Sequence, residues 1–285
     1  MPVPPLHRLL LLPLLLLCGL AAPDGPMAED GVLEPFPGCR ITRRTITEPR
    51  VNVVYIVRLD PAAVAFVGTP DNGPEPEETT LQTTRSFLDE HELDLAFNAH
   101  FYRAKGGLGP VPTPFADLCG AAVSGGEIIS RPEGGFPAVE IDEHNRLHLL
   151  APGDDLAGRH VVVAGSSVLV REGKNVVGDF ADKPHPRTAL GATAEGALVV
   201  AIVDGRQAGR SEGLTQRELA DLLVEEGVTT AINLDGGGST TLVIRNESGR
   251  SRVLNVPVGI FNQRGTERPV GSSLGVRALR RPAGE

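Results

Sequence analysis

The sequence predicts an α+β fold in a single domain, with helices packed on one large mixed β-sheet. Of the 285 residues, 41% are hydrophobic and 22% are charged, a globular composition that can bury a sizeable core. Short segments rich in β-branched residues recur along the chain, and each predicts a strand. Because strands and helices do not alternate strictly, a mixed sheet is favoured over a series of parallel βαβ units.

The predicted strands are short apolar segments bounded by turn residues. In chain order they cover residues 50–59, 93–99, 121–124, 138–141, 147–150, 161–170, 188–193, 197–203, 229–234 and 239–244. Residues 79–91 instead carry apolar side chains at helical spacing and predict a helix. The segments 70–78 and 105–114 are predicted loops because of their Gly and Pro content.

A second helix is specified more clearly, over residues 216–226. Thr215 and Glu218 form a capping-box pattern, in which the Thr215 side chain accepts from the backbone near Glu218 and the Glu218 carboxylate reaches back. An apolar face follows, made by Leu219, Leu222 and Leu223. Gly227 suits the left-handed conformation that ends many helices.

Residues 1–21 have the pattern of a secretory signal peptide. Arg8 supplies a positive start, the segment 9–20 is mostly apolar, and small residues follow. The apolar segment is short for a membrane span, which favours a cleaved signal peptide over the alternative of a retained membrane anchor. Lipidation at Cys18 is a third possibility, disfavoured by the large Leu17 before it. We therefore expect a periplasmic or extracellular protein, with a flexible leader at 22–38 and the folded domain at 39–281.

Two cysteines, Cys39 and Cys119, remain once the signal peptide is removed. In an oxidising compartment an even pair is a disulfide candidate, and a pair of buried free thiols is the alternative. Their distance in sequence and the absence of a CxxC spacing disfavour a zinc site. No metal and no cofactor is predicted.

The charge balance excludes one class of partner. Lys and Arg total 27 against 36 Asp and Glu, which gives a formal net charge of −9. Proteins that bind nucleic acid or anionic membranes usually concentrate basic residues on one surface, and this sequence is net acidic with no concentrated basic segment. The oligomeric state has no sequence signal.

The sequence NLDGGGSTT at residues 233–241 is the outstanding motif. Three consecutive glycines give a strand nothing to pack, whereas their bare amides (Gly236, Gly237 and Gly238) can form an anion-binding concavity. Asp235 would then stand beside that concavity at a strand end. A plain hairpin turn is the alternative, but it needs only one or two glycines. The segment lacks the Lys of a P-loop.

Three weaker motifs also lie at the ends of predicted strands. Asp204 and Arg206 follow one strand, Arg187 leads into another, and Asn98 and His100 lie at the end of a third. Each has an ordinary structural explanation: an Asp-Gly turn, a solvated charge, a turn cap or a structural histidine. Polar groups that converge at sheet ends beside Gly-rich loops are, however, the usual construction of a site.

The order of these motifs resembles the phosphodiester glycosidase domain family. Residues 185–244 carry the resemblance most closely, with the sequence HPRTALGATAEGALVVAIVDGRQAGRSEGLTQRELADLLVEEGVTTAINLDGGGSTTLVI. The similarity extends over about 98–276 and includes NVP at 255–257 and ERPV at 267–270. The family commonly has an Asn-Gly-Gly-Phe-Phe-like stretch where this chain has Asn98-Ala99-His100-Phe101-Tyr102, and the larger side chains narrow that part of the pocket.

The resemblance implies a hydrolase that splits a sugar from a phosphodiester at the anomeric carbon, and thus a phosphorylated glycan or polysaccharide as substrate. It assigns Asp235 to the anomeric centre, as nucleophile or as activator of water, with Asp204 as a second acid or base and His100 as its rival. The predicted substrate-binding set is Arg187, Asn98, Arg206, Gly236, Gly237, Gly238, Ser239 and Thr240. The sequence names neither the sugar nor the group beyond the phosphate, nor whether configuration is retained or inverted.

Three alternatives stay open at this point. The first is a glycosidase that acts on a non-phosphorylated exopolysaccharide, and the second is a non-catalytic carbohydrate-binding module. The third is a protein that binds a metal ion at Asp204 and Asp235. Two Tyr and no Trp argue against the binding module, since sugar-binding faces generally use aromatic platforms. The spacing of the two aspartates gives no coordination pattern.

Overall fold

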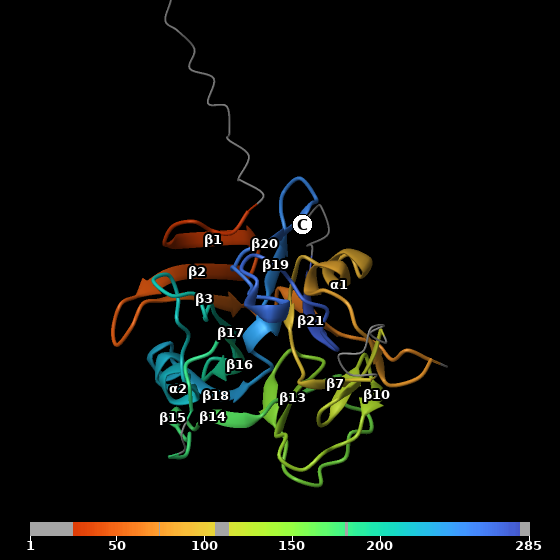
Figure 1. Ribbon diagram of the computed structural model, residues 1–285. Coiled ribbons are helices and arrows are strands. Elements are labelled where there is room, and N and C mark those ends of the chain that lie inside the picture. Colours follow the sequence, from red (N-terminus) through yellow and green to blue (C-terminus); the bar gives the residue numbers. More distant parts are fainter. Residues whose placement is uncertain (1–24, 74, 106–113, 180–181, 280–285) are drawn as a thin grey trace, which may run out of the picture.

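Antiparallel β-sheets make up most of the molecule (Figure 1), whose computed structural model describes residues 25–73, 75–105, 114–179 and 182–279. The largest sheet has eight strands in the order β1-β2-β3-β17-β16-β18-β14-β15. Their bounds are β1 Gly31–Phe36, β2 Cys39–Ile46, β3 Asn52–Leu59, β14 Ser167–Arg171, β15 Lys174–Asn175, β16 Arg187–Thr193, β17 Leu198–Val203 and β18 Val228–Asn233.

Two five-stranded sheets pack beside the large sheet. The β6 sheet has the order β20-β19-β6-β21-β4 and the β13 sheet the order β10-β9-β13-β11-β12, and a small sheet β5-β8-β7 completes the fold. The bounds in the β6 sheet are β4 Val64–Gly68, β6 Leu95–Asn98, β19 Leu242–Arg245, β20 Ser251–Val253 and β21 Ser273–Ala278. Those in the other two are β5 Thr79–Thr80, β7 Tyr102–Ala104, β8 Phe115–Leu118, β9 Ala122–Ser124, β10 Glu127–Ser130, β11 Ala138–Ile141, β12 Leu147–Leu149 and β13 Val161–Ala164.

The predicted α+β class is wrong, because the chain is mostly β. The described part of the chain holds only two α-helices, α1 Thr84–Glu90 and α2 Gln216–Glu225, and every ladder between its strands is antiparallel. The predicted helix 79–91 is helical only in its second half, since Thr79–Thr80 pairs as β5 and Thr83 caps α1. Apolar spacing identified the buried face of this segment but not where the helix begins.

The prediction of one large sheet is also wrong, because the strands are divided among several sheets. Gly165 marks one of the places where the chain passes from one sheet to another. The predicted strand 161–170 is β13 followed by β14, which belong to different sheets. Gly165 separates them where the chain passes so close to the carbonyl of Asn233 that a Cβ would collide with it. The valine-rich parts on either side of Gly165 resemble one strand in sequence, but the hydrogen-bonding partners change at the glycine.

The main hydrophobic core lies between the large sheet, the β6 sheet and the β13 sheet. Fully buried side chains from all three meet there, among them Ile41, Val57, Leu95, Val139, Ile202 and Leu274. Helix α2 covers the opposite face of the large sheet with Leu219 and Leu223, and α1 packs on the β6 sheet (Figure 1). The strands β16 and β17 are buried along their whole length, and the sequence of β17 is accordingly apolar throughout.

The start of α2 confirms the predicted capping box. The Thr215 hydroxyl accepts from the Glu218 N–H, and the Glu218 carboxylate accepts from the Thr215 N–H. Arg50 of the loop before β3 forms a two-pronged ion pair with the same Glu218, at 2.8 Å for each bond. The helix is thus fixed to the large sheet at its first turn.

The N-terminal part of the described chain differs from the expected flexible leader. Residues Gly31–Phe36 form β1, which pairs with β2, and the N–H of Met27 donates to the carbonyl of Leu254 at 3.0 Å. The predicted signal peptide and Cys18 lie outside the described residues, as does most of the 105–114 loop. None of the helices described is long and apolar enough to span a membrane.

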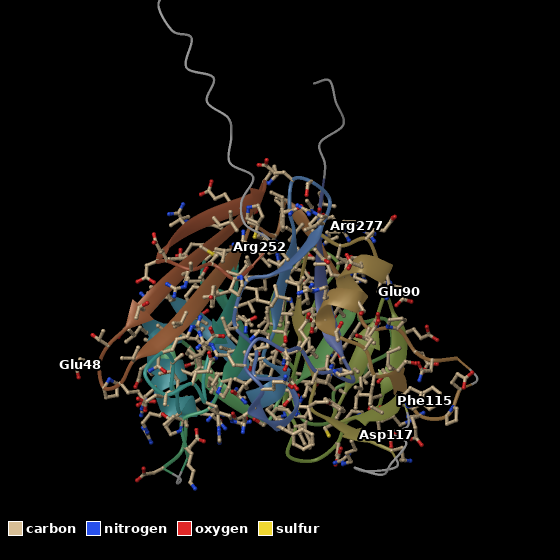
Figure 2. The ribbon with its side chains drawn as sticks, turned by 45° about the horizontal axis from the view of Figure 1, so that its top comes forward. Glu48, Glu90, Phe115, Asp117, Arg252 and Arg277 are labelled. Carbon is tan, nitrogen blue, oxygen red and sulfur yellow. The ribbon has the colours of Figure 1, made fainter. Side chains whose placement is uncertain are left out.

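Figure 2 shows the extent of the molecule. Glu48, on the turn between β2 and β3, lies at one end, and Phe115 and Asp117 of β8 lie at the other. Cys39 begins β2, whereas Cys119 directly follows β8, and both are buried free thiols that are not joined to each other. The disulfide candidate is therefore absent from the structure.

Candidate active site

Asp235 lies two residues after the end of β18, at the junction of the large sheet and the β6 sheet. Its residue is 7% exposed, its Oδ1 accepts from the N–H of Gly236 at 2.9 Å, and its Oδ2 accepts from the Ser239 hydroxyl. Burial raises the pKa of the Asp235 carboxyl, while the Ser239 hydroxyl and the charge of Arg268 oppose that rise. A carboxylate in this setting is poorly solvated and responsive to a nearby charge.

Arg268 completes a three-residue cluster with Asp235 and Ser239. The Arg268 Nε donates to the Ser239 Oγ at 3.0 Å, its Nη2 donates to the same oxygen, and Nη2 lies 3.5 Å from the Asp235 Oδ2. The guanidinium also lies over the ring of Tyr102, with its Cζ 5.9 Å from the ring centroid. The side chain of Arg268 is 31% exposed, so its cationic group reaches the surface beside Asp235.

A second guanidinium, that of the exposed Arg206, faces the same turn. A Cβ on Gly237 would lie 3.0 Å from the Arg206 Nη2. Desolvation and the neighbouring charges of Arg268 and Arg187 lower the pKa of Arg206, and the charge of Asp235 opposes them. His185 lies 3.4 Å from the same guanidinium, and partial burial and the Arg206 charge lower the pKa of its imidazole. The surroundings of Asp235 are thus cationic.

Close packing accounts for Gly236 and Gly238, and backbone conformation accounts for Gly237. A Cβ on Gly236 would lie 2.6 Å from the carbonyl oxygen of Pro186, and one on Gly238 would collide with the carbonyl of Gly259. Gly237 has a φ of +62°, the left-handed region that favours glycine. The amides of Gly236 and Gly237 already donate, to the Asp235 carboxylate and the Pro186 carbonyl respectively. The turn therefore threads between two chain segments, and these two amides are used within the protein.

The side chain of Asn98 fixes the turn at residues 235–241 by hydrogen bonds. It is fully buried at the end of β6, where its Nδ2 donates to the Asp235 carbonyl at 2.6 Å. Its Oδ1 accepts from the Thr188 hydroxyl at 2.8 Å and from the N–H of Thr241 at 3.2 Å. The side chain of Asn98 therefore fixes the turn rather than facing a ligand.

Asp204 and Asp235 share no hydrogen-bond partner among the described residues. Its buried carboxylate accepts from the Arg210 Nη1 at 2.8 Å, from the Asn255 Nδ2 at 3.1 Å and from the N–H of Val256 at 3.0 Å. Burial raises its pKa, and Arg210 opposes that rise. Asn255 also donates to the Thr240 carbonyl at 3.0 Å, so Asp204 supports the turn through Asn255. The predicted role of Asp204 as a second acid or base stays a prediction that this geometry does not favour.

Arg187 is tied to helix α2. Its Nη2 donates to both carboxylate oxygens of Asp182, at 2.7 and 2.8 Å, and its Nε donates to the Leu214 carbonyl at 2.8 Å. Asp182 in turn accepts from the N–H of Gln216, the first residue of α2, at 2.6 Å. The guanidinium predicted to grip phosphate thus forms a nearly buried ion pair at a helix start.

His100 is a buried structural contact. The N–H of Ala164 donates to its Nε2 at 3.0 Å, and its Nδ1 lies 3.0 Å from the Ser272 hydroxyl. Burial lowers the pKa of His100 to about 4, so the ring is neutral at pH 7 and joins β13 to the start of β21. The Thr240 side chain is also buried, and its hydroxyl has no hydrogen-bond partner among the described residues.

The site residues that sequence reasoning missed are Arg268 and Tyr102. Both lie in segments quoted for the family resemblance, ERPV at 267–270 and the stretch from Asn98 to Tyr102, but neither was assigned a role. The sequence did contain a signal for Arg268. It lies between Glu267 and Pro269 in a Gly-rich segment where no strand or helix is predicted, so a structural role in such an element does not explain it. Predicting its partner, Ser239, requires the fold.

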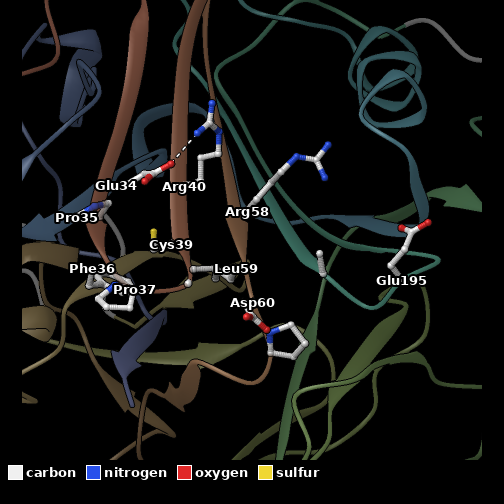
Figure 3. A pocket seen from close by; sticks show the side chains of 13 residues that line it. Glu34, Pro35, Phe36, Pro37, Cys39, Arg40, Arg58, Leu59, Asp60 and Glu195 are labelled. Atoms are coloured by element: carbon white, nitrogen blue, oxygen red, sulfur yellow. Dashed lines mark hydrogen bonds and ion pairs between the residues drawn. The ribbon is translucent and has the colours of Figure 1, made fainter. Parts of the chain in front are cut away.

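The site does not coincide with the hollow of about 810 Å³ at the end of the β1–β2 hairpin (Figure 3). The two arginines that line it are already paired, since Arg40 bonds Glu34 and Arg58 bonds Glu226. Burial raises the pKa of the Cys39 thiol there to about 12, which makes the thiol unreactive at pH 7. Within the described ranges, no three His, Cys, Asp or Glu side chains come together in a way that could hold a metal ion.

Comparisons with solved structures identify the same fold. The catalytic domain of zebrafish N-acetylglucosamine-1-phosphodiester alpha-N-acetylglucosaminidase, auto-inhibited by its pro-peptide, aligns with a TM-score of 0.65 and 19% identity over 87% of each chain. A hypothetical protein from Synechocystis aligns with a TM-score of 0.66 and 13% identity, over 89% of this chain and 64% of the other. At these identities the likeness concerns the fold alone.

Sequence comparisons add shorter but closer matches. The chain is 47% identical over 65 residues to the Bos taurus N-acetylglucosamine-1-phosphodiester alpha-N-acetylglucosaminidase, which is 23% of this chain and 12% of that protein. It is 41% identical over 63 residues to the SPbeta prophage-derived uncharacterized protein YomE of Bacillus subtilis (strain 168), 22% of this chain and 10% of that protein. These matches thus span about a tenth of the length of the curated relatives.

The match to a family model is broader than either. The model described as phosphodiester glycosidase aligns with residues 91–277, which include β6, the turn after β18 and the segment that carries Arg268. The fold, the 233–241 motif and this alignment agree, and the chain belongs to the phosphodiester glycosidase family.

Proposed function

We propose that this chain is an exported hydrolase that cleaves a sugar from a sugar-1-phosphodiester. The observation that carries the proposal is the buried carboxylate of Asp235, which has the Arg268 guanidinium 3.5 Å away and that of Arg206 against Gly237 of the same turn. An anion bound at the arginines and a developing positive charge met by the carboxylate are what this reaction requires. The names of two relatives make N-acetylglucosamine the first sugar to test.

In the proposed reaction the bond between the anomeric carbon and the phosphate oxygen breaks. The electron pair goes to the oxygen, so a phosphate monoester leaves, and water adds to the anomeric carbon and loses a proton. Arg268 and Arg206 stabilise the charge on the departing phosphate. Asp235 stabilises the cationic sugar, as nucleophile or as the base that activates water.

One carboxylate is sufficient for this substrate class. A phosphate monoester is already a good leaving group, so the reaction depends less on a general acid than cleavage of an ordinary glycoside does. This agrees with the other carboxylates near the turn, because Asp204 pairs with Arg210 and Glu267 with Arg85. A neutral exopolysaccharide without phosphate, by contrast, gives the two arginines no anion to bind.

A substrate comparison tests the proposal. The full chain is incubated with an N-acetylglucosamine-1-phosphodiester and with an aryl N-acetylglucosaminide, and free sugar is measured. We expect sugar release from the phosphodiester, abolished by Asp235→Asn and retained by Asp221→Asn, a matched change on the exposed face of α2. Release from the aryl glycoside alone, or full activity of Asp235→Asn, contradicts the proposal.

Export has its own test. Residues 1–21 carry the signal-peptide pattern, and cleavage after Ala21 would leave a mature chain that begins at Ala22. Expression in a bacterium with an outer membrane, followed by N-terminal sequencing of the periplasmic and culture fractions, measures this directly. An uncleaved chain in the membrane fraction supports the retained anchor instead.

A further inference from the structure

The loop from Val258 to Arg268 builds one wall of the site. Its ends are fastened together, because the N–H of Gly265 donates to the Pro257 carbonyl at 2.7 Å and Val258 bridges to Thr266. Its first turn rests on the triple-glycine turn, where Gly259 and Gly238 are in contact. Its last residue is Arg268, which bonds Ser239. The loop is therefore held at its base by the same residues that build the site.

The tip of this loop presents two apolar side chains to solvent. Phe261 is 88% exposed and Ile260 is 49% exposed. Phe261 also has a φ of +58° and Asn262 a φ of +56°, a left-handed conformation that is costly for a bulky aromatic residue. An exposed ring held in a strained backbone stabilises nothing in the described fold, and such features are concentrated where a ligand binds.

Contacts place the tip next to the cationic part of the site. The Oδ1 of Asn262 accepts from the Nη1 of Arg206 at 3.1 Å, and Arg206 lies against Gly237 of the turn. Contacts thus lead outward from the turn that follows Asp235 to Arg206, then to Asn262, and then to its neighbour Phe261. A substrate with its sugar at Asp235 and its phosphate at the arginines directs its remaining group towards this tip.

We propose that Phe261 and Ile260 form a preformed platform for an apolar face of the alcohol group on the far side of the phosphate. The inference rests on the proposed function and adds to it the chemical class of that group. Contact with a ring face is largely non-directional and grows with the apolar area that it covers. Because the loop is already fastened at its base, little ordering is needed when the group binds.

A pair of matched substrates tests the platform. The full chain is assayed with the methyl and the benzyl phosphodiesters of N-acetylglucosamine-1-phosphate. We expect kcat/KM to be about tenfold higher for the benzyl ester than for the methyl ester, because partial burial of a phenyl ring provides a factor of this size. The gain should appear as a lower KM for the benzyl ester. Phe261→Asn accommodates the left-handed backbone and removes the ring, so it should lower the benzyl-to-methyl ratio to about one.

Two further variants control for other causes. Phe261→Trp keeps an aromatic face and should keep the preference for the benzyl ester. Val32→Ala alters an apolar side chain that is 49% exposed on the edge strand β1, and it should also keep the wild-type ratio. A wild-type ratio near one, or a ratio that Phe261→Asn leaves unchanged, overturns the platform while the proposed function stands.

Binding measurements separate the platform from turnover. In the Asp235→Asn background, calorimetry compares the affinities for the methyl and benzyl esters with and without Phe261→Asn. Tighter binding of the benzyl ester that depends on Phe261 supports the platform even if no substrate is hydrolysed. Equal affinities overturn it, and absence of hydrolysis in the wild type counts against the proposed function alone.

Discussion

The side chain of Asn98 donates to the main-chain carbonyl of Asp235 at 2.6 Å, and this bond joins the end of β6 to the turn after β18. The two strands belong to different sheets, so the candidate carboxylate stands where those sheets meet. The position of Asp235 therefore depends on the packing of the whole core. A residue that never touches substrate can control the site through this junction.

Replacement of Asn98 by Ala tests this dependence. Three buried groups lose a partner, namely the Asp235 carbonyl, the Thr188 hydroxyl and the Thr241 N–H. Unsatisfied buried groups are costly, so we expect the free energy of unfolding to fall by about 3 kcal/mol. Denaturant unfolding measures this, with the partly exposed Asn175→Ala, expected to cost under about 1 kcal/mol, as the control. Equal losses in the two variants would show that Asn98 has no special place.

Arg268 tests the cationic side of the site. Its Nε and Nη2 both bond Ser239, and a lysine cannot reproduce that two-nitrogen geometry. We expect Arg268→Lys to lower kcat/KM for a sugar-1-phosphodiester by about 100-fold, the usual effect of removing one electrostatic donor. Arg264→Lys, an exposed change in the same loop, should stay within about twofold. If Arg268→Lys behaves like Arg264→Lys, Arg268 takes no part in catalysis.

Arg187 shows what the sequence could predict and what it could not. The pattern placed an Arg at the start of a buried strand, and β16 does begin there. Successive side chains of a strand point to opposite faces, and Thr188 points to Asn98 at the site junction. Arg187 therefore points to the other face, towards Asp182 and α2. One sequence cannot fix which face is the functional one, because that depends on how the sheets pack.

The same limit applies to the rest of the site. Local signals were sufficient for α2, its capping box and the strand that ends before Asp235, because these depend on neighbouring residues. The division of the strands among several sheets depends on pairing between residues far apart in the chain. The partnership of Ser239 with Arg268, 29 residues apart, is of that kind, and so is the hydrogen bond from Asn255 to Asp204, 51 residues apart.

The ion pair of Arg187 with Asp182 predicts a loss of stability on mutation. Removing one partner leaves a nearly buried charge uncompensated, so Arg187→Ala should lower the free energy of unfolding by about 3 kcal/mol. Arg217→Ala is the control, since its ion pair with Asp179 is exposed and contributes little. A variant that keeps its unfolding free energy while its KM for a phosphodiester rises would return Arg187 to the phosphate site.

His100 predicts a pH dependence of stability. Burial lowers its pKa to about 4 in the folded chain, against the ordinary value of 6.5 that applies when the chain is unfolded. Between these values the unfolded chain binds the proton and the folded chain does not, so stability rises with pH in this window. The contribution is fully present above pH 6.5 and is lost as the pH falls towards 4, by about 3 kcal/mol in total.

The comparison of the wild type with His100→Gln isolates this contribution from the carboxylates that titrate in the same range. Glutamine can still accept from the N–H of Ala164, which the ring Nε2 accepts at 3.0 Å, but it has no proton to gain. The free energy of unfolding, measured by denaturant titration at intervals between pH 7 and 4, should therefore fall less steeply in the variant, by about 3 kcal/mol over the range. Parallel curves would mean that His100 titrates normally, which requires the ring to reach solvent and contradicts its burial between Ala164 and Ser272.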